Sequence, residues 1–119
     1  MSLETTNPIN GKKIQVTLQD LGLMNWFDAN KACAALGRGW RLPTMVELEV
    51  MYKELHLKGK GNFCGDCLYW SSTEYGNGFN WNGDYWQYDP EAWLVDFANG
   101  YSAKLPQDDN NQVRAVRDL

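Results

Sequence analysis

The order in which helical and strand-like segments follow one another restricts this chain to few folds. Two segments with helical spacing lie early, at residues 25–36 and 44–55. Apart from one early strand at 13–19, the strand-like segments come later, at 68–73, 92–97, 101–105 and 113–117. Helices grouped early and strands grouped late are typical of an α+β domain with an antiparallel sheet. The 119 residues are expected to form one such domain.

The second helical segment carries the clearest local signal. Residues 44–47 form a capping box, in which the Thr44 side chain accepts from the Glu47 amide and the Glu47 side chain reaches back. The first helical segment begins at Asn25, a favoured capping residue type, and ends at Gly37. Helical spacing predicts that these helices bury Trp26, Ala29, Cys33, Leu36, Leu48, Met51, Tyr52 and Leu55.

The strand segments show their own patterns. Alternation over 13–19 predicts a half-buried strand with Ile14, Val16 and Leu18 on one face. Asn99-Gly100 is a strong signal for a tight hairpin between the strands at 92–97 and 101–105. In the predicted strand at 92–97, one face carries Trp93, Val95 and Phe97.

Composition excludes some classes of function and raises one question. The net charge of −4 argues against nucleic-acid binding, which favours basic surfaces. No segment approaches the roughly 18 apolar residues of a membrane span, so we expect no membrane insertion. Six Trp, six Tyr and four Phe serve either a tightly packed core or a recognition surface, and their placement must decide between these uses.

Five short motifs in order resemble a family of bacterial C-type-lectin-like domains. The family is named for the C-terminal domain of the Legionella collagen-like adhesin and is catalogued as a domain of unknown function. The resemblance covers residues 26–117. The motifs are Trp26, Ala29 and Cys33; Trp40 to Thr44 with Glu47-Leu48; Tyr69 to Glu74; Trp93, Val95, Phe97 and Gly100; and Val113-Arg114 with Val116-Arg117.

The resemblance implies a C-type lectin fold, in which two helices pack on a twisted antiparallel sheet and a long loop region projects. It also implies a non-catalytic, adhesin-like binding module, with the domain at the bacterial cell surface, secreted or periplasmic. The sequence shows no recognisable signal peptide, and a cytoplasmic location stays open. The oligomeric state also stays open.

One position departs from the family pattern. Many members carry a cysteine between the two Val-Arg pairs that bridges to the helix cysteine, and here that position is Ala115. Cys33 is therefore expected to be a small buried apolar residue without its usual partner.

The arginine and tryptophan residues of these motifs are expected to build the fold. Arginine side chains offer five donors that tie loops together, which is the role expected of Arg41, Arg114 and Arg117. The tryptophans at motif positions are assigned to the core: Trp26, Trp40, Trp70 and Trp93.

The pair Cys64 and Cys67 has several interpretations. A local disulfide or free thiols are favoured over a zinc site completed by Cys33 and His56. The enzyme hypothesis, a relative of the formylglycine-generating enzyme, lacks that enzyme's cysteine context. It also lacks an evident nucleophile–base pair, since His56 is the single histidine. We therefore expect no enzymatic activity.

Calcium is a candidate ligand because many animal lectins bind sugars through it. The usual Glu-Pro-Asn and Gln-Pro-Asp triplets are absent, and the nearest string is Asp89-Pro90-Glu91. Oxygen ligands of the type calcium prefers cluster weakly at Asp108, Asp109 and Asn110. The expectation is no cofactor, with calcium as the lesser alternative.

The segment from Tyr75 to Pro90 is the predicted binding site. It has neither a helical nor a strand period and is predicted to be a long irregular loop. Rigid aromatic rings interleaved with Gly and Asn resemble the composition of an antibody paratope. The alternative is a loop that covers the sheet and buries its own rings. The predicted ligand-binding residues are Tyr75, Phe79, Trp81, Asn82, Asp84, Tyr85, Trp86 and Tyr88.

The expected ligand is a protein or a glycan. An alternative is the variable receptor-binding protein of a diversity-generating retroelement, because mutagenesis at adenines enriches Asn and Tyr near the C-terminus, as over residues 75–112. Two genomes whose copies differ only in that range would establish it.

Overall fold

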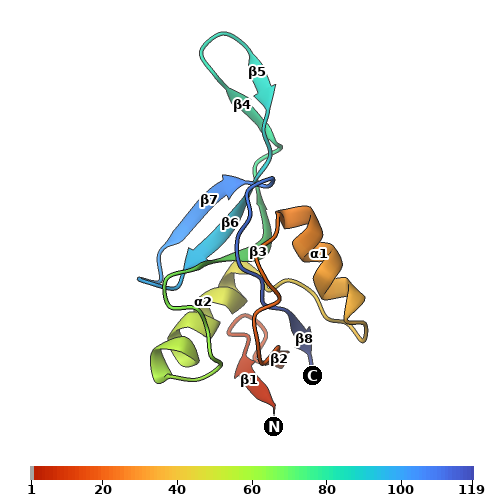
Figure 1. Cartoon of the computed structure of the whole chain (residues 1–119), viewed down its shortest axis with the longest axis vertical. Coiled ribbons are helices and arrows are strands. Elements are labelled where there is room, and N and C mark those ends of the chain that lie inside the picture. The colour runs from red at the N-terminus through yellow and green to blue at the C-terminus, as the bar shows by residue number, and fades with distance from the viewer. Residues whose placement is uncertain (1) are drawn as a thin grey trace.

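The computed structural model describes residues 2–119 and shows an α+β architecture (Figure 1). The helices are α1 (Trp26–Ala35), α2 (Met45–Glu54) and the short 3₁₀ helix η1 (His56–Lys58). The strands are β1 (Leu3–Thr6), β2 (Lys13–Val16), β3 (Leu68–Tyr75), β4 (Phe79–Trp81), β5 (Trp86–Tyr88), β6 (Glu91–Asp96), β7 (Ser102–Pro106) and β8 (Val116–Asp118). No helix within residues 2–119 is both long enough and apolar enough to cross a bilayer.

The strands form three antiparallel groups. One sheet has the order β1-β2-β8, the second has the order β3-β6-β7, and β4 pairs only with β5. Both termini lie at one end of the molecule, whereas the β4–β5 ribbon projects from the opposite end (Figure 1). This projection stretches the molecule to 53 × 30 × 28 Å.

The paired strands β3 and β6 separate two apolar clusters. Because side chains alternate along a strand, Tyr69 and Val95 face the cluster beneath α2, while Trp70 and Leu94 face the one beneath α1. The α2 side also holds Leu48, Met51 and Leu55, as the helical spacing predicted. The predicted buried residues of α1 are confirmed at Ala29 and Cys33. Both faces of this sheet are therefore covered.

The predicted caps are confirmed. The Asn25 side chain accepts from the Asp28 amide, and the Thr44–Glu47 capping box has both of its hydrogen bonds. The Asn99-Gly100 hairpin between β6 and β7 is also present. Gly100 has a φ of +79°, and a Cβ there would lie 2.5 Å from the Tyr52 ring, so this turn requires glycine.

Several sequence-based expectations were wrong at the ends of elements. The early strand ends at Val16, and Leu18 beyond it is 51 % exposed, because Thr17 turns to pair with Ala115. Leu36 caps α1 and is exposed instead of buried. The last strand is shorter than residues 113–117: β8 starts at Val116, whereas Val113 and Ala115 are buried in the α1-side cluster.

The four tryptophans that were assigned to the core differ in how deeply they are buried. Trp70 is fully buried and donates its indole N–H to the Met24 carbonyl at 2.9 Å. Trp26 and Trp40 are partly buried against the α1-side cluster. Trp93 is only half-buried, because it lies on the face of β6 near Tyr75, outside both clusters.

Candidate binding site

Residues 75–90 form a projecting two-stranded ribbon, here called the aromatic hairpin, and not the predicted irregular loop. In its register Phe79 lies opposite Tyr88 and Trp81 lies opposite Trp86. Positions two apart on a strand share a face, so these four rings stand on one face of the ribbon. The ring centroids are 5.1 Å apart in the first pair and 5.7 Å apart in the second.

The rings of the aromatic hairpin are exposed to solvent. The exposed fraction ranges from 39 % at Tyr75 to 65 % at Trp86, and the other four predicted aromatic residues, Phe79, Trp81, Tyr85 and Tyr88, lie between these values. The alternative in which the segment covers the sheet and buries its rings is therefore wrong. The structure brings the eight predicted ligand-binding residues together on this one ribbon.

Polar side chains of the aromatic hairpin shape its turn and base. Asn82 Oδ1 accepts from the amides of Asp84 and Tyr85, each at 3.0 Å, so this predicted ligand-binding oxygen is used by the turn. At the base, Asn80 donates to the Asp89 carbonyl at 2.8 Å. The Asp84 carboxylate remains exposed at the tip.

The narrow base of the aromatic hairpin depends on Gly78. This residue is buried with a φ of +88°, and a Cβ there would lie 2.6 Å from the Tyr88 ring. The Asp89 amide donates to the Gly78 carbonyl at 2.7 Å and closes the ribbon. The sequence pattern placed Gly78 among the glycines of an irregular loop. It did not predict this contact with Tyr88, because the strand register was unknown.

We expect Gly78→Ala to disorder the aromatic hairpin without unfolding the domain. The methyl group clashes with Tyr88 and strains a left-handed residue, at a cost of about 1–2 kcal/mol, confined to a ribbon with few core contacts. Amide exchange in residues 79–88 should accelerate while the melting temperature stays nearly constant. Gly76→Ala, where a Cβ meets nothing within 4 Å, is the matched control for backbone strain alone. Equal exchange in both variants would contradict the prediction.

A small cleft of about 140 Å³ lies at the base of the aromatic hairpin. Aromatic residues from three elements line it, namely Phe27, Tyr75 and Tyr88, together with the acidic residue Glu74. Lys104 also contacts Tyr75, with its ammonium 3.6 Å from the ring centroid. The cleft therefore combines aromatic surface with a negative charge.

The three motif arginines are structural, as expected. Arg41 makes a two-pronged ion pair with the buried Glu47, at 2.7 and 2.9 Å. Arg114 is fully buried and bonds Asp20 and three backbone carbonyls. Arg117 bonds Gln15 and lies over the Trp40 ring.

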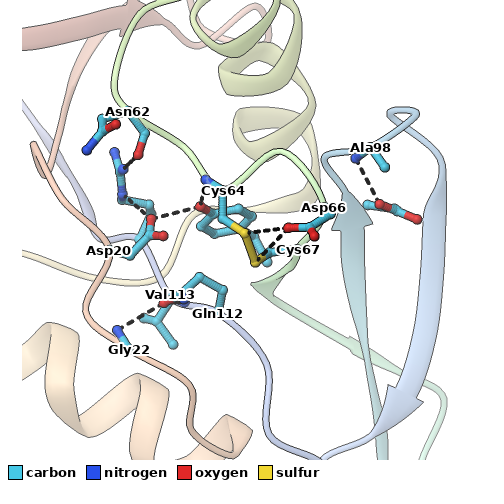
Figure 2. Close-up of a disulfide and its surroundings, with 12 residues drawn as sticks. Asp20, Gly22, Asn62, Cys64, Asp66, Cys67, Ala98, Gln112 and Val113 are labelled. Atoms are coloured by element: carbon cyan, nitrogen blue, oxygen red, sulfur yellow. Dashed lines mark hydrogen bonds and ion pairs between the residues drawn. A yellow bond between two sulfur atoms is a disulfide. The ribbon is translucent and has the colours of Figure 1, made fainter.

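The structure joins Cys64 and Cys67 in a disulfide, with Asp66 beside it (Figure 2). Asp66 Oδ1 lies 3.0 Å from Cys64 Sγ. Cys33 lies in the α1-side cluster, whereas Cys64 and Cys67 pack against the α2-side cluster. The zinc site that combined all three cysteines is therefore not formed. The weak calcium candidates Asp108, Asp109 and Asn110 are exposed on the turn after β7, and calcium there stays a prediction.

Cys33 is expected to be chemically inert in the native protein. It is fully buried, and burial raises the pKa of its thiol to about 12, so almost no thiolate exists at neutral pH. A thiol-reactive dye should label it only after denaturation. Labelling of the native protein at pH 7 on the same timescale as free cysteine would contradict this prediction.

The family model for the Lcl C-terminal domain matches residues 6–117. The chain belongs to this family. The match extends the resemblance in the sequence N-terminally into β1, the strand that sequence patterns did not predict. No curated protein sequence matches the chain.

Solved structures similar to this Lcl C-terminal domain share the C-type lectin fold. Botrocetin matches with a TM-score of 0.63 and 13 % identity, covering 97 % of this chain and 95 % of botrocetin. TC14, a C-type lectin of the tunicate Polyandrocarpa misakiensis, matches at 0.56 with 11 % identity over 89 % and 98 % of the two chains. Ovocleidin-17 of the Gallus gallus eggshell matches at 0.55 with 15 % identity over 99 % and 96 %. At such identities the comparison establishes the fold alone.

Proposed function

We propose that this Lcl C-terminal domain is a non-catalytic, adhesin-like module that binds a protein or glycan on the aromatic face of its hairpin. The observation that carries the proposal is the row of exposed rings at positions 79, 81, 86 and 88. Their ribbon pairs with no other strand of residues 2–119, so it contributes little to the core. Contiguous exposed apolar surface of this kind marks interaction sites.

The likeness to botrocetin supports binding of a protein. One similar structure is the complex of botrocetin with the A1 domain of von Willebrand factor, with a TM-score of 0.58 and 14 % identity to this chain. Tyr and Trp give large, rigid contact area at low entropic cost, which suits a protein partner as well as a sugar ring.

The surroundings of the reactive side chains support a non-enzymatic function. His56 is packed among aromatic rings, with its ring centroid 5.3 Å from that of Phe97. Cys33 is buried, and Cys64 and Cys67 are held in their disulfide. Loss of an assayed activity in a His56, Cys64 and Cys67 triple variant would revive the enzyme hypothesis.

The disulfide also supports a location at the cell surface, in the periplasm or outside the cell. Disulfides persist in oxidising compartments and are rare in the cytosol. We therefore include an oxidising location of this kind in the proposal.

A glycan and surface-protein array tests the proposal. Trp81→Ala combined with Trp86→Ala should lower binding by about 10- to 100-fold, because aromatic anchors dominate such interfaces. The melting temperature should change little, since both rings are exposed. Tyr101→Ala removes a ring that is 73 % exposed on the β6–β7 turn and serves as the control. Undiminished binding by the double variant would remove the hairpin from the function.

A further inference from the structure

Residues 74–91, the aromatic hairpin with its two flanking positions, contain four carboxylates and no Lys or Arg, and the cation beside them is Lys104 of β7, which contacts the Tyr75 ring. All 11 Lys and Arg residues of the chain lie outside residues 61–103. The same segment contains the carboxylates Asp66, Glu74, Asp84, Asp89, Glu91 and Asp96. This segment therefore carries six negative side chains and no positive one, whereas the rest of the chain carries 11 positive and nine negative side chains.

The carboxylates nearest to the rings have no cation paired with them. Glu74 and Glu91 flank the base of the aromatic hairpin, Asp89 lies at its base and Asp84 at its tip. The ion pairs among residues 2–119 involve other carboxylates, those of Asp20, Glu47, Glu54 and Asp118. These four hairpin carboxylates therefore remain available to a ligand.

The base cleft shows the chemistry that this charge distribution favours. Glu74 lines it together with Phe27, Tyr75 and Tyr88. Cations are attracted both to aromatic faces and to carboxylates, and a volume of about 140 Å³ suits one side-chain head group. The contact of Lys104 with Tyr75 shows that a ring at this site already accepts an ammonium group.

We infer that the partner of the aromatic hairpin is a protein segment rich in Arg and Lys, one of whose cationic head groups enters the base cleft. This inference rests on the proposed function and names the partner's chemistry. Arg guanidinium planes stack on Trp and Tyr rings, and the surrounding carboxylates attract the segment during approach. Acidic glycans and acidic proteins meet like charge on the same surface and are disfavoured.

A peptide array separates this inference from the proposed function. The probes are short Gly/Ser peptides that carry Arg, Lys, Gln or Glu at the same positions, presented beside neutral and sulfated glycans. The wild-type domain should bind the Arg and Lys peptides at least tenfold more tightly than the Gln peptides and should not bind the Glu peptides. Binding should weaken as salt concentration rises.

Two carboxylate variants give the matched control. Asp84→Asn removes an exposed charge from the hairpin tip, and Glu4→Gln removes an exposed charge from β1 at the other end of the molecule. We expect Asp84→Asn to weaken the Arg peptide about two- to fivefold and to flatten its salt dependence. Glu4→Gln should do neither. Glu74→Gln should have a larger effect than Asp84→Asn if a cationic head group occupies the cleft.

The possible results of the array distinguish the basic partner from the proposed function. Preference for Gln peptides, Glu peptides or a glycan, abolished by Trp81→Ala with Trp86→Ala, overturns the basic partner and leaves the proposed function standing. Preference for Arg peptides that survives the double tryptophan variant overturns both. Absence of binding to every probe counts against both as well.

Discussion

Replacing Arg114 by Met is expected to lower the free energy of unfolding by about 3–5 kcal/mol, enough to unfold much of the protein at physiological temperature. The guanidinium is fully buried and donates to Asp20 at 2.7 Å and to the carbonyls of Thr17, Gly61 and Asn62 at 2.7–3.0 Å. It also lies 4.1 Å from the Phe63 ring centroid. Met fills the volume but leaves these acceptors without a donor.

The destabilisation caused by Arg114→Met should spread to neighbouring segments, because its partner Asp20 belongs to a larger hydrogen-bond network. Asp20 also accepts from the Tyr69 hydroxyl at 2.8 Å, and that hydroxyl accepts from the Cys64 amide (Figure 2). Burial raises the pKa of Tyr69, which keeps the hydroxyl protonated as the donor. Arg114 thus connects the chain after β2, the loop after η1 and the start of β3.

Urea denaturation measures this effect, and Arg117→Met is its control. Arg117 is half-buried and makes one side-chain bond to Gln15, so its loss should cost about 1 kcal/mol. A loss below 1.5 kcal/mol for Arg114→Met would show that water replaces the guanidinium and that the network is not structural.

Glu47→Gln should lower the free energy of unfolding by about 2–4 kcal/mol at pH 7. The Glu47 carboxylate is fully buried and accepts two bonds from Arg41, one from the Thr44 amide and one from Asn7. A glutamine keeps one acceptor oxygen for the cap but turns an N–H₂ group toward the Arg41 donors. This loss of stability is smaller than that expected for a fully buried ion pair, because the Arg41 side chain is 37 % exposed and reaches water.

The same carboxylate makes stability depend on pH. Burial raises the pKa of Glu47, but the hydrogen bonds from Arg41 and the Thr44 amide outweigh it and hold the pKa below its usual value of 4.5. An acid with a lowered folded-state pKa stabilises the fold above its unfolded pKa, and this stability is lost as the pH falls through the folded value. The wild type should therefore lose stability below about pH 4.5, and Glu47→Gln should lose less over the same range.

Glu49→Gln on the same helix is the control for Glu47→Gln. Glu49 is half-buried and forms no ion pair among the described residues, so its replacement should change stability by less than about 0.5 kcal/mol. Parallel acid unfolding of the wild type and the Glu47 variant would assign the pH dependence to other carboxylates.

The accuracy of the sequence interpretation differed between local and long-range features. The caps of the two helices and the Asn99-Gly100 turn were predictable because their hydrogen bonds join residues at most five positions apart. The ion pair of Arg114 with Asp20 spans 94 positions, and no local pattern encodes it. The early end of β2 and the exposed Leu18 were missed for a similar reason, because Thr17 pairs with Ala115, which is 98 positions away in the sequence.

For the candidate site, the sequence identified the residues but not their arrangement. The eight predicted residues carry their aromatic and polar chemistry in their side chains, and composition alone indicated a recognition segment. The pairing of Phe79 with Tyr88 and of Trp81 with Trp86, which places the rings on one face, depends on strand register. A one-residue slip would turn the rings of one strand to the opposite face.

The sequence by itself therefore determined the helices, their caps, the family and the segment that carries the exposed aromatic residues, because each depends on neighbouring residues or on side-chain identity. Only the tertiary structure decided that the segment is a projecting ribbon, that Trp93 is half-buried while Trp70 is enclosed, and that Glu74 lies in a cleft with rings from three elements. These features arise when distant segments pack together, since burial and strand register are set by contacts that exist only in the folded chain.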